Sequence, residues 1–281
     1  MGPPDAAPLG LIAGRGVLPL AVARSARRRG RAVVAIALHA EAAPELEAEV
    51  SQLTWLHPGE VDRAISTLRA AGVAEAVLAG KLPKLTLDDA STLRPDAGAL
   101  ELLRRLSDRQ DASILSGVAD HLARHGIRLL PQAELVPELV AKPGRYGRVA
   151  ATREQLADLA FGWPIAKAVA GLGIGQTLVV RARAVLAVEA IEGTDAAILR
   201  AGRLSPGASV LKVASPAQDP RFDLPALGPE TLSALVEAKA GLLAFEAGAA
   251  LVLEPERLVA AADAQGIALP GVGAPPPWAP A

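Results

Sequence analysis

The stretch that decides the fold is Leu9-Gly-Leu-Ile-Ala-Gly-Arg-Gly-Val-Leu-Pro19. It opens with a short apolar run that ends in glycine, which predicts a buried β-strand over residues 9–13. Pro19 suits the first turn of a helix expected over residues 19–29. Glycines at a strand-to-helix turn let the backbone approach a phosphate, which the helix N-terminus favours. Gly14, Arg15 and Gly16 are therefore candidate phosphate or nucleotide contacts, and an ordinary tight turn is an equally good interpretation.

Strands and helices alternate through the rest of the first half. Apolar runs predict further strands at 32–38, 75–79 and 127–130. Amphipathic spacing predicts a helix at 61–71, and a glycine C-cap predicts another at 111–125. This alternation indicates the α/β class, with a mostly parallel sheet covered by helices on both faces.

Prolines and glycines cluster between residues 131 and 148. We place there the connection between an N-terminal domain, residues 1–133, and a C-terminal domain, residues 134–281, without a sharp boundary. The second domain opens with a helical stretch over 152–170, which Pro164 is expected to kink or split. The elements expected after it form an α+β or mixed α/β domain: strands at 177–182, 184–190, 209–214, 241–245 and 249–253, and helices at 229–239 and 255–266.

Composition narrows the function classes. Lys and Arg number 29 against 30 Asp and Glu, so no overall basic field favours nucleic acid, and 2% aromatic residues give no stacking platform for single strands. The absence of cysteine excludes disulfides, thiol nucleophiles and cysteine-bound metals. With no signal peptide and no apolar run of about 18 residues, we expect a cytoplasmic protein without a membrane span. The four histidines show no metal-ligand spacing and are interpreted as surface or boundary residues: His39, His57, His121 and His125.

Gly80 and Lys81 follow the strand expected at 75–79. Ligands in open α/β sheets bind beyond the carboxyl ends of the strands, so Lys81 could contact a phosphate there. A solvated basic loop is the slightly favoured alternative on the residues alone.

The strongest pattern is Val188-Glu-Ala-Ile-Glu-Gly-Thr-Asp195, in which three carboxylates fall within seven residues at a strand end. Glu189 lies in an otherwise apolar run, where an unpaired charge is costly. Clustered carboxylates suit Mg²⁺, which takes oxygen ligands, often one or two carboxylates together with substrate phosphate. Glu189, Glu192 and Asp195 are therefore candidate metal ligands. A helix cap at Thr194 or Asp195 beside one paired glutamate explains the spacing equally well.

Lys212 and the segment Arg221-Phe-Asp-Leu-Pro225 form the last candidate group. The proline favours an extended segment, in which Arg221 and Asp223 point the same way. Arg221 could hold a phosphate as a fork, while Asp223 could hold a metal or a water. On the residues alone, a surface ion pair is the favoured interpretation.

Taken together, these segments resemble the LpxI-type UDP-2,3-diacylglucosamine pyrophosphatase family over about residues 9–272. Two positions depart from the family pattern: Arg15 replaces the middle glycine of a triplet, and Gly173 replaces an aspartate. The segments that carry the resemblance by their order and spacing are Leu9 to Gly14, Val17 to Pro19, Gly173 to Gln176, Leu186 to Ala190, Glu192 to Asp195, Lys212 and Arg221 to Pro225.

The resemblance implies an N-terminal Rossmann-like domain followed by a C-terminal mixed α/β catalytic domain. It also implies Mg²⁺-supported hydrolysis of the diphosphate of UDP-2,3-diacylglucosamine, giving 2,3-diacylglucosamine 1-phosphate (lipid X) and UMP in lipid A biosynthesis. The partner would be this lipid-linked nucleotide sugar, with peripheral contact to the inner membrane and a homodimer as further expectations.

The family pattern also assigns roles to residues of this chain. Asp223 is expected to be the central catalytic carboxylate and a Mg²⁺ ligand, with Glu189, Glu192 and Asp195 as further ligands. The residues expected to contact substrate are Gly14, Arg15, Gly16, Gly80, Lys81, Gln176, Thr194, Lys212 and Arg221.

Two alternatives stay open. A non-catalytic module that binds a nucleotide or nucleotide sugar could use the same glycine loop. An NAD(P)-dependent oxidoreductase is disfavoured because Pro19 stands where the dinucleotide fingerprint has its third glycine, and because Glu41 comes too late to be the ribose-binding acid.

Overall fold

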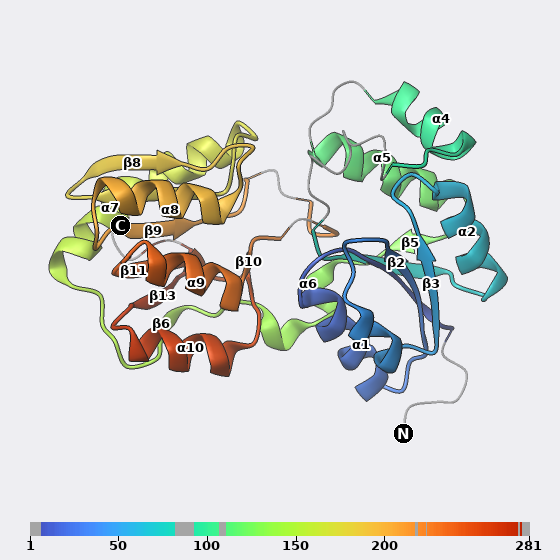
Figure 1. Ribbon diagram of the computed structural model, residues 1–281, viewed down its shortest axis with the longest axis horizontal. Helices are drawn as coiled ribbons and strands as arrows, with labels where there is room; N and C mark the ends of the chain where they lie inside the picture. Colours follow the sequence, from blue (N-terminus) through green and yellow to red (C-terminus); the bar gives the residue numbers. More distant parts are fainter. Residues whose placement is uncertain are drawn as a thin grey trace. The chain divides into compact units, whose positions relative to one another are not determined.

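A computed structural model gives the fold (Figure 1). It describes residues 7–81, 93–106, 111–216, 219–222, 224–274 and 276, without the side chains of 111 and 112. The chain divides into two compact units. Unit 1 comprises Met1–Pro137 with Asp219–Phe222, and unit 2 comprises Glu138–Gln218 with Asp223–Ala281.

Unit 1 is a five-stranded parallel sheet in the order β3-β2-β1-β4-β5. The chain order reverses between β1 and β4, which makes the carboxyl ends of these two strands the switch point of the sheet. The α/β class and parallel sheet expected for this half are confirmed. Its elements are β1 (Leu9–Ala13), α1 (Leu18–Arg28), β2 (Val33–Leu38), η1 (Pro44–Glu49), β3 (Gln52–Leu56), α2 (Val61–Ala70), β4 (Glu75–Ala79), α4 (Ala97–Arg105), α5 (Asp111–Arg124), β5 (Arg128–Leu129), α6 (Gln132–Leu135) and η2 (Pro137–Leu139), the last running past the unit boundary.

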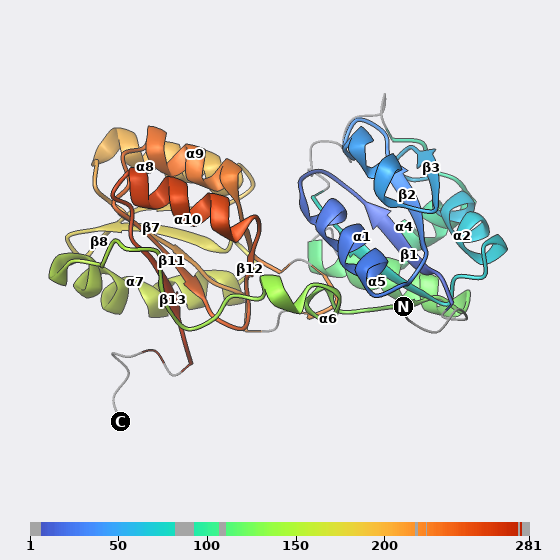
Figure 2. The same ribbon diagram turned by 90° about the horizontal axis from the view of Figure 1, so that it is seen from below.

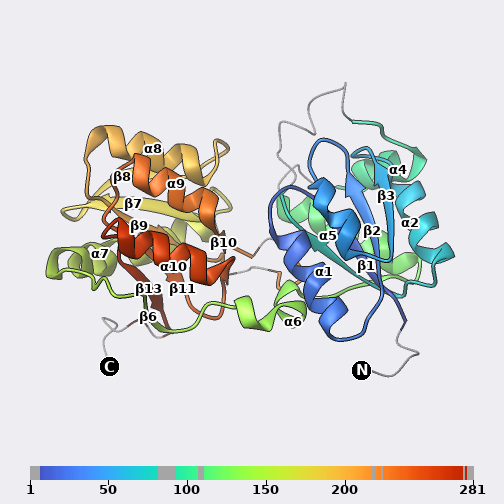
Figure 3. The ribbon, with the colours of Figure 1, turned by 60° about the horizontal axis from the view of Figure 1, so that its bottom comes forward.

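The two faces of this sheet are covered by different helices (Figure 3). Val34, Ile36 and Leu56 pack against residues of α2 and α5, while α1 lies over the other face. Phe222, which comes from far along the chain, is 2% exposed in the same cluster as α2 and α5. A short piece of the second half of the sequence is therefore part of the unit 1 core.

Unit 2 is a six-stranded mixed sheet in the order β6-β13-β11-β9-β7-β8. Strands β9, β11 and β13 are parallel, β7 and β8 form an antiparallel hairpin, and β6 runs antiparallel to β13. The mixed α/β fold expected here is confirmed. Its elements are β6 (Gly144–Tyr146), α7 (Arg153–Gly171), β7 (Thr177–Arg181), β8 (Ala184–Val188), α8 (Thr194–Leu204), β9 (Ser209–Lys212), β10 (Ala226–Leu227), α9 (Pro229–Glu237), β11 (Leu242–Glu246), β12 (Leu251–Val252), α10 (Pro255–Ala264) and β13 (Leu269–Val272).

Helices α8, α9 and α10 cover one face of the unit 2 sheet and α7 covers the other (Figure 2). Helix α7 runs unbroken through Pro164, so of the expected kink or split the split does not occur. A capping box fixes the start of the helix, since Thr152 Oγ1 accepts from the Gln155 N–H at 3.2 Å. Leu159 and Trp163 are buried before the proline, as is Ala166 beyond it, so packing holds both halves to one sheet face.

Candidate functional site

The carboxyl ends of β9 and β11 gather most of the polar residues singled out in unit 2. Lys212 ends β9 and pairs with Thr177, the first residue of the antiparallel β7. The next hairpin strand, β8, ends at the same edge, where the Glu189 N–H donates to the Thr177 carbonyl at 2.9 Å. Ligands of open sheets bind at this type of edge.

A chain of hydrogen bonds joins these side chains. Lys212 Nζ donates to Thr194 Oγ1 at 2.7 Å, and Thr194 Oγ1 donates to Glu189 Oε1 at 2.9 Å. Glu189 Oε2 in turn accepts from the Gln176 N–H at 3.3 Å. Lys212 is 4% exposed, and a buried ammonium is tolerated only where partners compensate its charge. The structure thus brings together Gln176, Glu189, Thr194 and Lys212.

Glu192 faces a different partner. Its carboxylate pairs with Arg200 at 2.6 Å and accepts from the Ala190 N–H at 3.1 Å. Hydrogen bonds from its own backbone N–H and then from the Arg200 guanidinium hold the pKa of Glu192 below its usual range. Asp195 lies in the first turn of α8.

Among the residues that the structure describes, no three His, Cys, Asp or Glu side chains gather as a metal site. Glu189, Glu192 and Asp195 therefore supply oxygen donors of the kind Mg²⁺ prefers, but they do not make a three-ligand set by themselves. Asp223, the expected central carboxylate, lies outside the described residues.

An ion pair at the same edge was missed from the sequence. Lys167 of α7 donates to both carboxylate oxygens of Glu246, at 2.9 and 3.0 Å, and to the Ala214 carbonyl at 2.7 Å. Glu246 ends β11, whose Phe245 pairs with Lys212. The available signal was a lysine inside an apolar helix and a glutamate ending an apolar strand. Their partnership spans 79 residues and could not be read from spacing.

In unit 1, the two predicted glycine loops meet at the switch point. The Gly14 N–H donates to the Ala79 carbonyl at 2.9 Å, and Arg15 and Lys81 exchange backbone hydrogen bonds at 2.8 and 2.9 Å. A Cβ on Gly14 would lie 2.5 Å from the Lys81 oxygen, so glycine is required for this approach. The N–H groups of Gly14, Arg15 and Lys81 therefore serve the loops themselves and are not available to a phosphate.

Arg15, which departs from the family pattern, is held by a buried acid. Its Nε lies 3.0 Å from Oε2 of Glu41, which follows β2 and is 7% exposed. The Arg15 side chain itself is 56% exposed. The contact links the carboxyl ends of β1 and β2 and fixes the cation at the edge of the sheet.

Arg221 belongs to unit 1 rather than to the Lys212 group. Its guanidinium forms a fork on Asp219, with Nη2 to Oδ2 at 2.7 Å and Nε to Oδ1 at 3.0 Å. This fork lowers the pKa of Asp219 and raises the pKa of Arg221. Arg221 therefore forms an ion pair with Asp219, a residue not singled out from the sequence, and its expected pairing with Asp223 falls outside the described residues.

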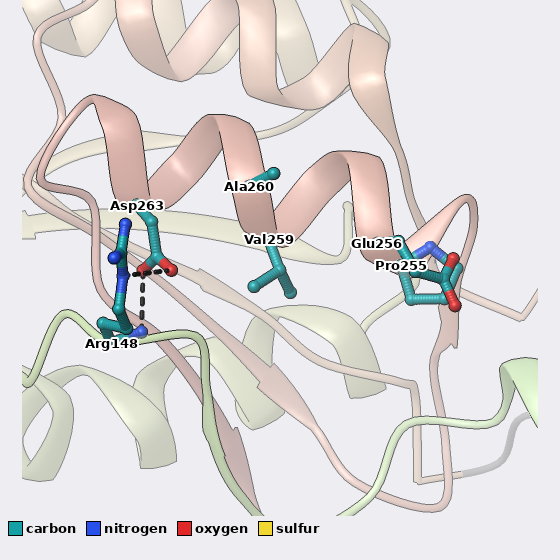
Figure 4. Close-up of a pocket in the computed structure, with 6 residues that line it drawn as sticks. All are labelled: Arg148, Pro255, Glu256, Val259, Ala260 and Asp263. Atoms are coloured by element: carbon teal, nitrogen blue, oxygen red, sulfur yellow. Dashed lines mark hydrogen bonds and ion pairs between the residues drawn. The ribbon is translucent and has the colours of Figure 1, made fainter.

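A shallow hollow beside α10 contains none of the residues chosen from the sequence (Figure 4). Asp263 accepts from the Arg148 N–H at 2.7 Å and from the Val149 N–H at 3.3 Å, so it tethers the segment before α7 to α10. Asp263 therefore has a structural role beside the hollow. Its lining residues are Arg148, Pro255, Glu256, Val259, Ala260 and Asp263.

No helix in the described ranges combines the length and apolarity needed to cross a membrane. Solved structures with some likeness include the biotin carboxylase subunit of pyruvate carboxylase, at 14% identity over 66% of this chain and 39% of that chain, with a TM-score of 0.27. N5-carboxyaminoimidazole synthetase from Staphylococcus aureus has 14% identity over 62% and 38%, with a TM-score of 0.24. Scores this low carry no argument about fold or function.

Sequence relatives are far more informative. The LpxI N-terminal domain matches residues 8–139 and the LpxI C-terminal domain matches residues 142–270. The UDP-2,3-diacylglucosamine pyrophosphatase LpxI of Caulobacter vibrioides (strain ATCC 19089 / CIP 103742 / CB 15) is 34% identical over 276 residues, which cover 94% of this chain and 97% of the relative. With both domains present in order and nearly the whole length matched, the chain belongs to the LpxI family.

Proposed function

We propose that this protein hydrolyses the diphosphate of UDP-2,3-diacylglucosamine, releasing 2,3-diacylglucosamine 1-phosphate and UMP in lipid A biosynthesis. The observation that carries the proposal is the near full-length match to a relative named for this activity. The polar edge of unit 2 supports it, because a buried lysine linked through Thr194 to Glu189 is suited to binding phosphate oxygens.

The reaction requires a water oxygen to form a bond to phosphorus while the bond to the leaving phosphate breaks and the water loses a proton to a base. Asp223 is the proposed base or water-positioning carboxylate. Lys212 would neutralise charge on the phosphate oxygens, held in place by Thr194 and Glu189. Arg221 would assist through the guanidinium donors that its Nε and Nη2 contacts with Asp219 leave over.

Mg²⁺ dependence is part of the proposal. Bound Mg²⁺ would supply further charge neutralisation on the phosphates. The proposed ligands are Asp223 with Glu189, Glu192 and Asp195. Because Glu189 and Glu192 already accept from Thr194 and Arg200, they would have to share or exchange these partners.

The test is UMP release from UDP-2,3-diacylglucosamine by the purified full chain, with Mg²⁺ or with EDTA. We expect release with Mg²⁺, loss of release with EDTA, and a fall of at least about 100-fold in kcat for Asp223→Asn, as for loss of an acid–base group. Glu101→Gln, at an exposed pair on α4, is the matched charge control and should leave kcat unchanged. Absence of UMP from wild-type protein would refute the activity, while full turnover in Asp223→Asn would remove this residue from the mechanism.

Peripheral membrane contact is also proposed, on the support of α7. Between residues 156 and 175 the only charged residues are Asp158 and Lys167. Asp158 is 2% exposed and accepts from the Arg183 N–H, and Lys167 is turned toward Glu246. The large apolar side chains left exposed on and after the helix are Leu156, Phe161, Leu172 and Ile174. A homodimer that covers this surface is the competing proposal, and the cytoplasmic location stays a prediction.

A further inference from the structure

Three rings meet at the carboxyl ends of β2 and β3 in unit 1. The ring centroids of His39 and His57 lie 4.5 Å apart, and those of His39 and Trp55 lie 5.6 Å apart. The sheet register explains the cluster. Ala37 pairs with Trp55, and the His39 N–H extends the ladder by donating to the Leu56 carbonyl at 2.9 Å. Since side chains alternate along strands, His39, Trp55 and His57 all project from the same face of the sheet.

This cluster lies on the other face of the sheet from the core that β2 and β3 form with α2 and α5. The core shared with α2 and α5 takes the alternate residues Val34, Ile36 and Leu56, which point to the opposite face. His39 is exposed, and Trp55 and His57 are only half-buried. In a chain with 2% aromatic residues, an open group of an indole and two imidazoles is not explained by packing.

The rings share their sheet edge with the other candidate ligand residues of unit 1. In the strand order β3-β2-β1-β4, the rings lie at β3 and β2, Arg15 follows β1 and Lys81 follows β4. Arg15 is tied to Glu41, which follows β2 just beyond His39. One edge therefore runs from stacking surfaces to basic side chains, the two features that a nucleotide requires for its base and its phosphates.

The turn that carries His57 is fixed by its own contacts. The His57 N–H donates to Glu60 Oε2 at 2.6 Å, and Glu60 also pairs with Arg63. Gly59 has a φ of +97° and lies against the backbone of Arg94, so the turn has little freedom. A ring held this way can bind a planar ligand with little loss of conformational entropy.

We propose that His39, Trp55 and His57 form the binding surface for the nucleobase of the substrate. The ring faces would stack on the base, and the imidazole nitrogens would hydrogen-bond its polar edge. The inference rests on the proposed function for the identity of the base, uracil, and it assigns that base to unit 1.

The experiment compares two ligands by calorimetric titration of the full chain: UMP, and ribose 5-phosphate, which lacks the base. We expect wild-type protein to bind UMP at least about tenfold more tightly than ribose 5-phosphate, and His39→Ala or His57→Ala to weaken UMP binding by about tenfold while leaving ribose 5-phosphate unchanged. Trp55→Phe keeps a ring and should retain most of the affinity. His125→Ala removes an imidazole just after α5 that bonds the His121 carbonyl, and this matched control should bind UMP as wild type does.

Three results would overturn the proposal. The preference for UMP could survive both histidine variants, both ligands could lose affinity equally in these variants, or wild-type protein could bind the two ligands equally.

Measuring turnover of UDP-2,3-diacylglucosamine distinguishes failure of the base site from failure of the proposed function. Unchanged kcat/KM in His39→Ala and His57→Ala would refute the base site and leave the hydrolase standing. Ring-dependent UMP binding without any turnover would support the base site and refute the hydrolase activity.

Discussion

Lys212 keeps an ammonium group at 4% exposure and donates to the Thr194 hydroxyl. A negative charge lies one step further, on Glu189, and Thr194 connects the two by accepting from one and donating to the other. Hydrogen bonds that relay between charges in a poorly solvated site polarise one another, so the middle residue matters more than its own polarity suggests.

Thr194→Val should therefore disturb the site without changing its shape. Removing the hydroxyl leaves a buried donor on Lys212 and an acceptor on Glu189 without their shared partner, which costs about 1–3 kcal/mol of unfolding free energy. UMP release should fall as well, because Lys212 is no longer held. Urea unfolding and the UMP assay measure the two effects, and Thr67→Val, which removes a half-buried hydroxyl bonded only to the Arg63 carbonyl of its own helix, is the control. A Thr194→Val protein as stable and active as wild type would contradict the relay.

At the scale of elements, α7 is unusual because it is apolar on both its buried and its exposed sides. A helix apolar all round is normally enclosed by protein or lipid. Its inner side packs on the sheet through Leu159, Trp163 and Ala166, while Leu172 is 73% exposed just beyond its end. The loop that follows touches the polar edge, since a Cβ on Gly175 would lie 2.2 Å from the Glu189 carbonyl oxygen. The apolar surface therefore leads directly to the proposed reaction site.

We expect Leu172→Asp to weaken binding of the full chain to phospholipid vesicles by about tenfold or more in a flotation assay, because an added charge opposes burial in the interface. Leu204→Asp is the matched control. Leu204 is 65% exposed, but it ends α8 on the opposite face of the sheet, so this variant should float as wild type does. Equal flotation of the two variants would exclude α7 as the contact. Light scattering that shows a dimer lost in Leu172→Asp would assign the surface to a second copy instead.

The sequence predicted the helices and strands that depend on local residue patterns and on the order of elements along the chain. Alternating strands and helices predicted the parallel sheet of the first half, and the apolar runs predicted most strands of the second. The sequence did not predict β3, whose alternating Gln52–Leu56 segment is ordered by pairing with β2. The strand expected over 177–182 also ends one residue earlier, because Ala182 and Arg183 take positive φ and Asp158 of α7 accepts from the Arg183 N–H.

The site was predicted less completely, for a physical reason. Glu189 was found because it is a charge in an apolar run, Thr194 as a candidate helix cap, and the substrate roles of Thr194 and Lys212 through the family resemblance. The Lys167–Glu246 pair and the three-ring cluster depend on strand register and on contacts between distant segments, which spacing along the chain does not encode. Glu192 was grouped with Glu189 by spacing, yet its carboxylate forms an ion pair with Arg200.

At the scale of the molecule, the two units are not consecutive halves of the chain. Asp219–Phe222 returns to unit 1, where Arg221 forks onto Asp219 and Phe222 enters the core with α2 and α5. The segment directly precedes Asp223, so the proposed catalytic residue follows a stretch anchored in the first unit's core. A change in the packing of unit 1 should therefore affect residues in the second half of the sequence.

Phe222→Ala tests this anchoring. Emptying a site that is 2% exposed should lower the unfolding free energy of unit 1 by about 3–5 kcal/mol, the usual cost of a buried Phe→Ala change. Hydrogen exchange should locate the loss in β2, β3 and α5, although the substitution lies about 100 residues beyond α5. Phe161→Ala, at a 37% exposed phenylalanine of α7, is the control and should cost less than about 1 kcal/mol. If Phe222→Ala instead loosened only the amides of unit 2, Phe222 would belong to that unit and the catalytic segment would have no anchor in the first.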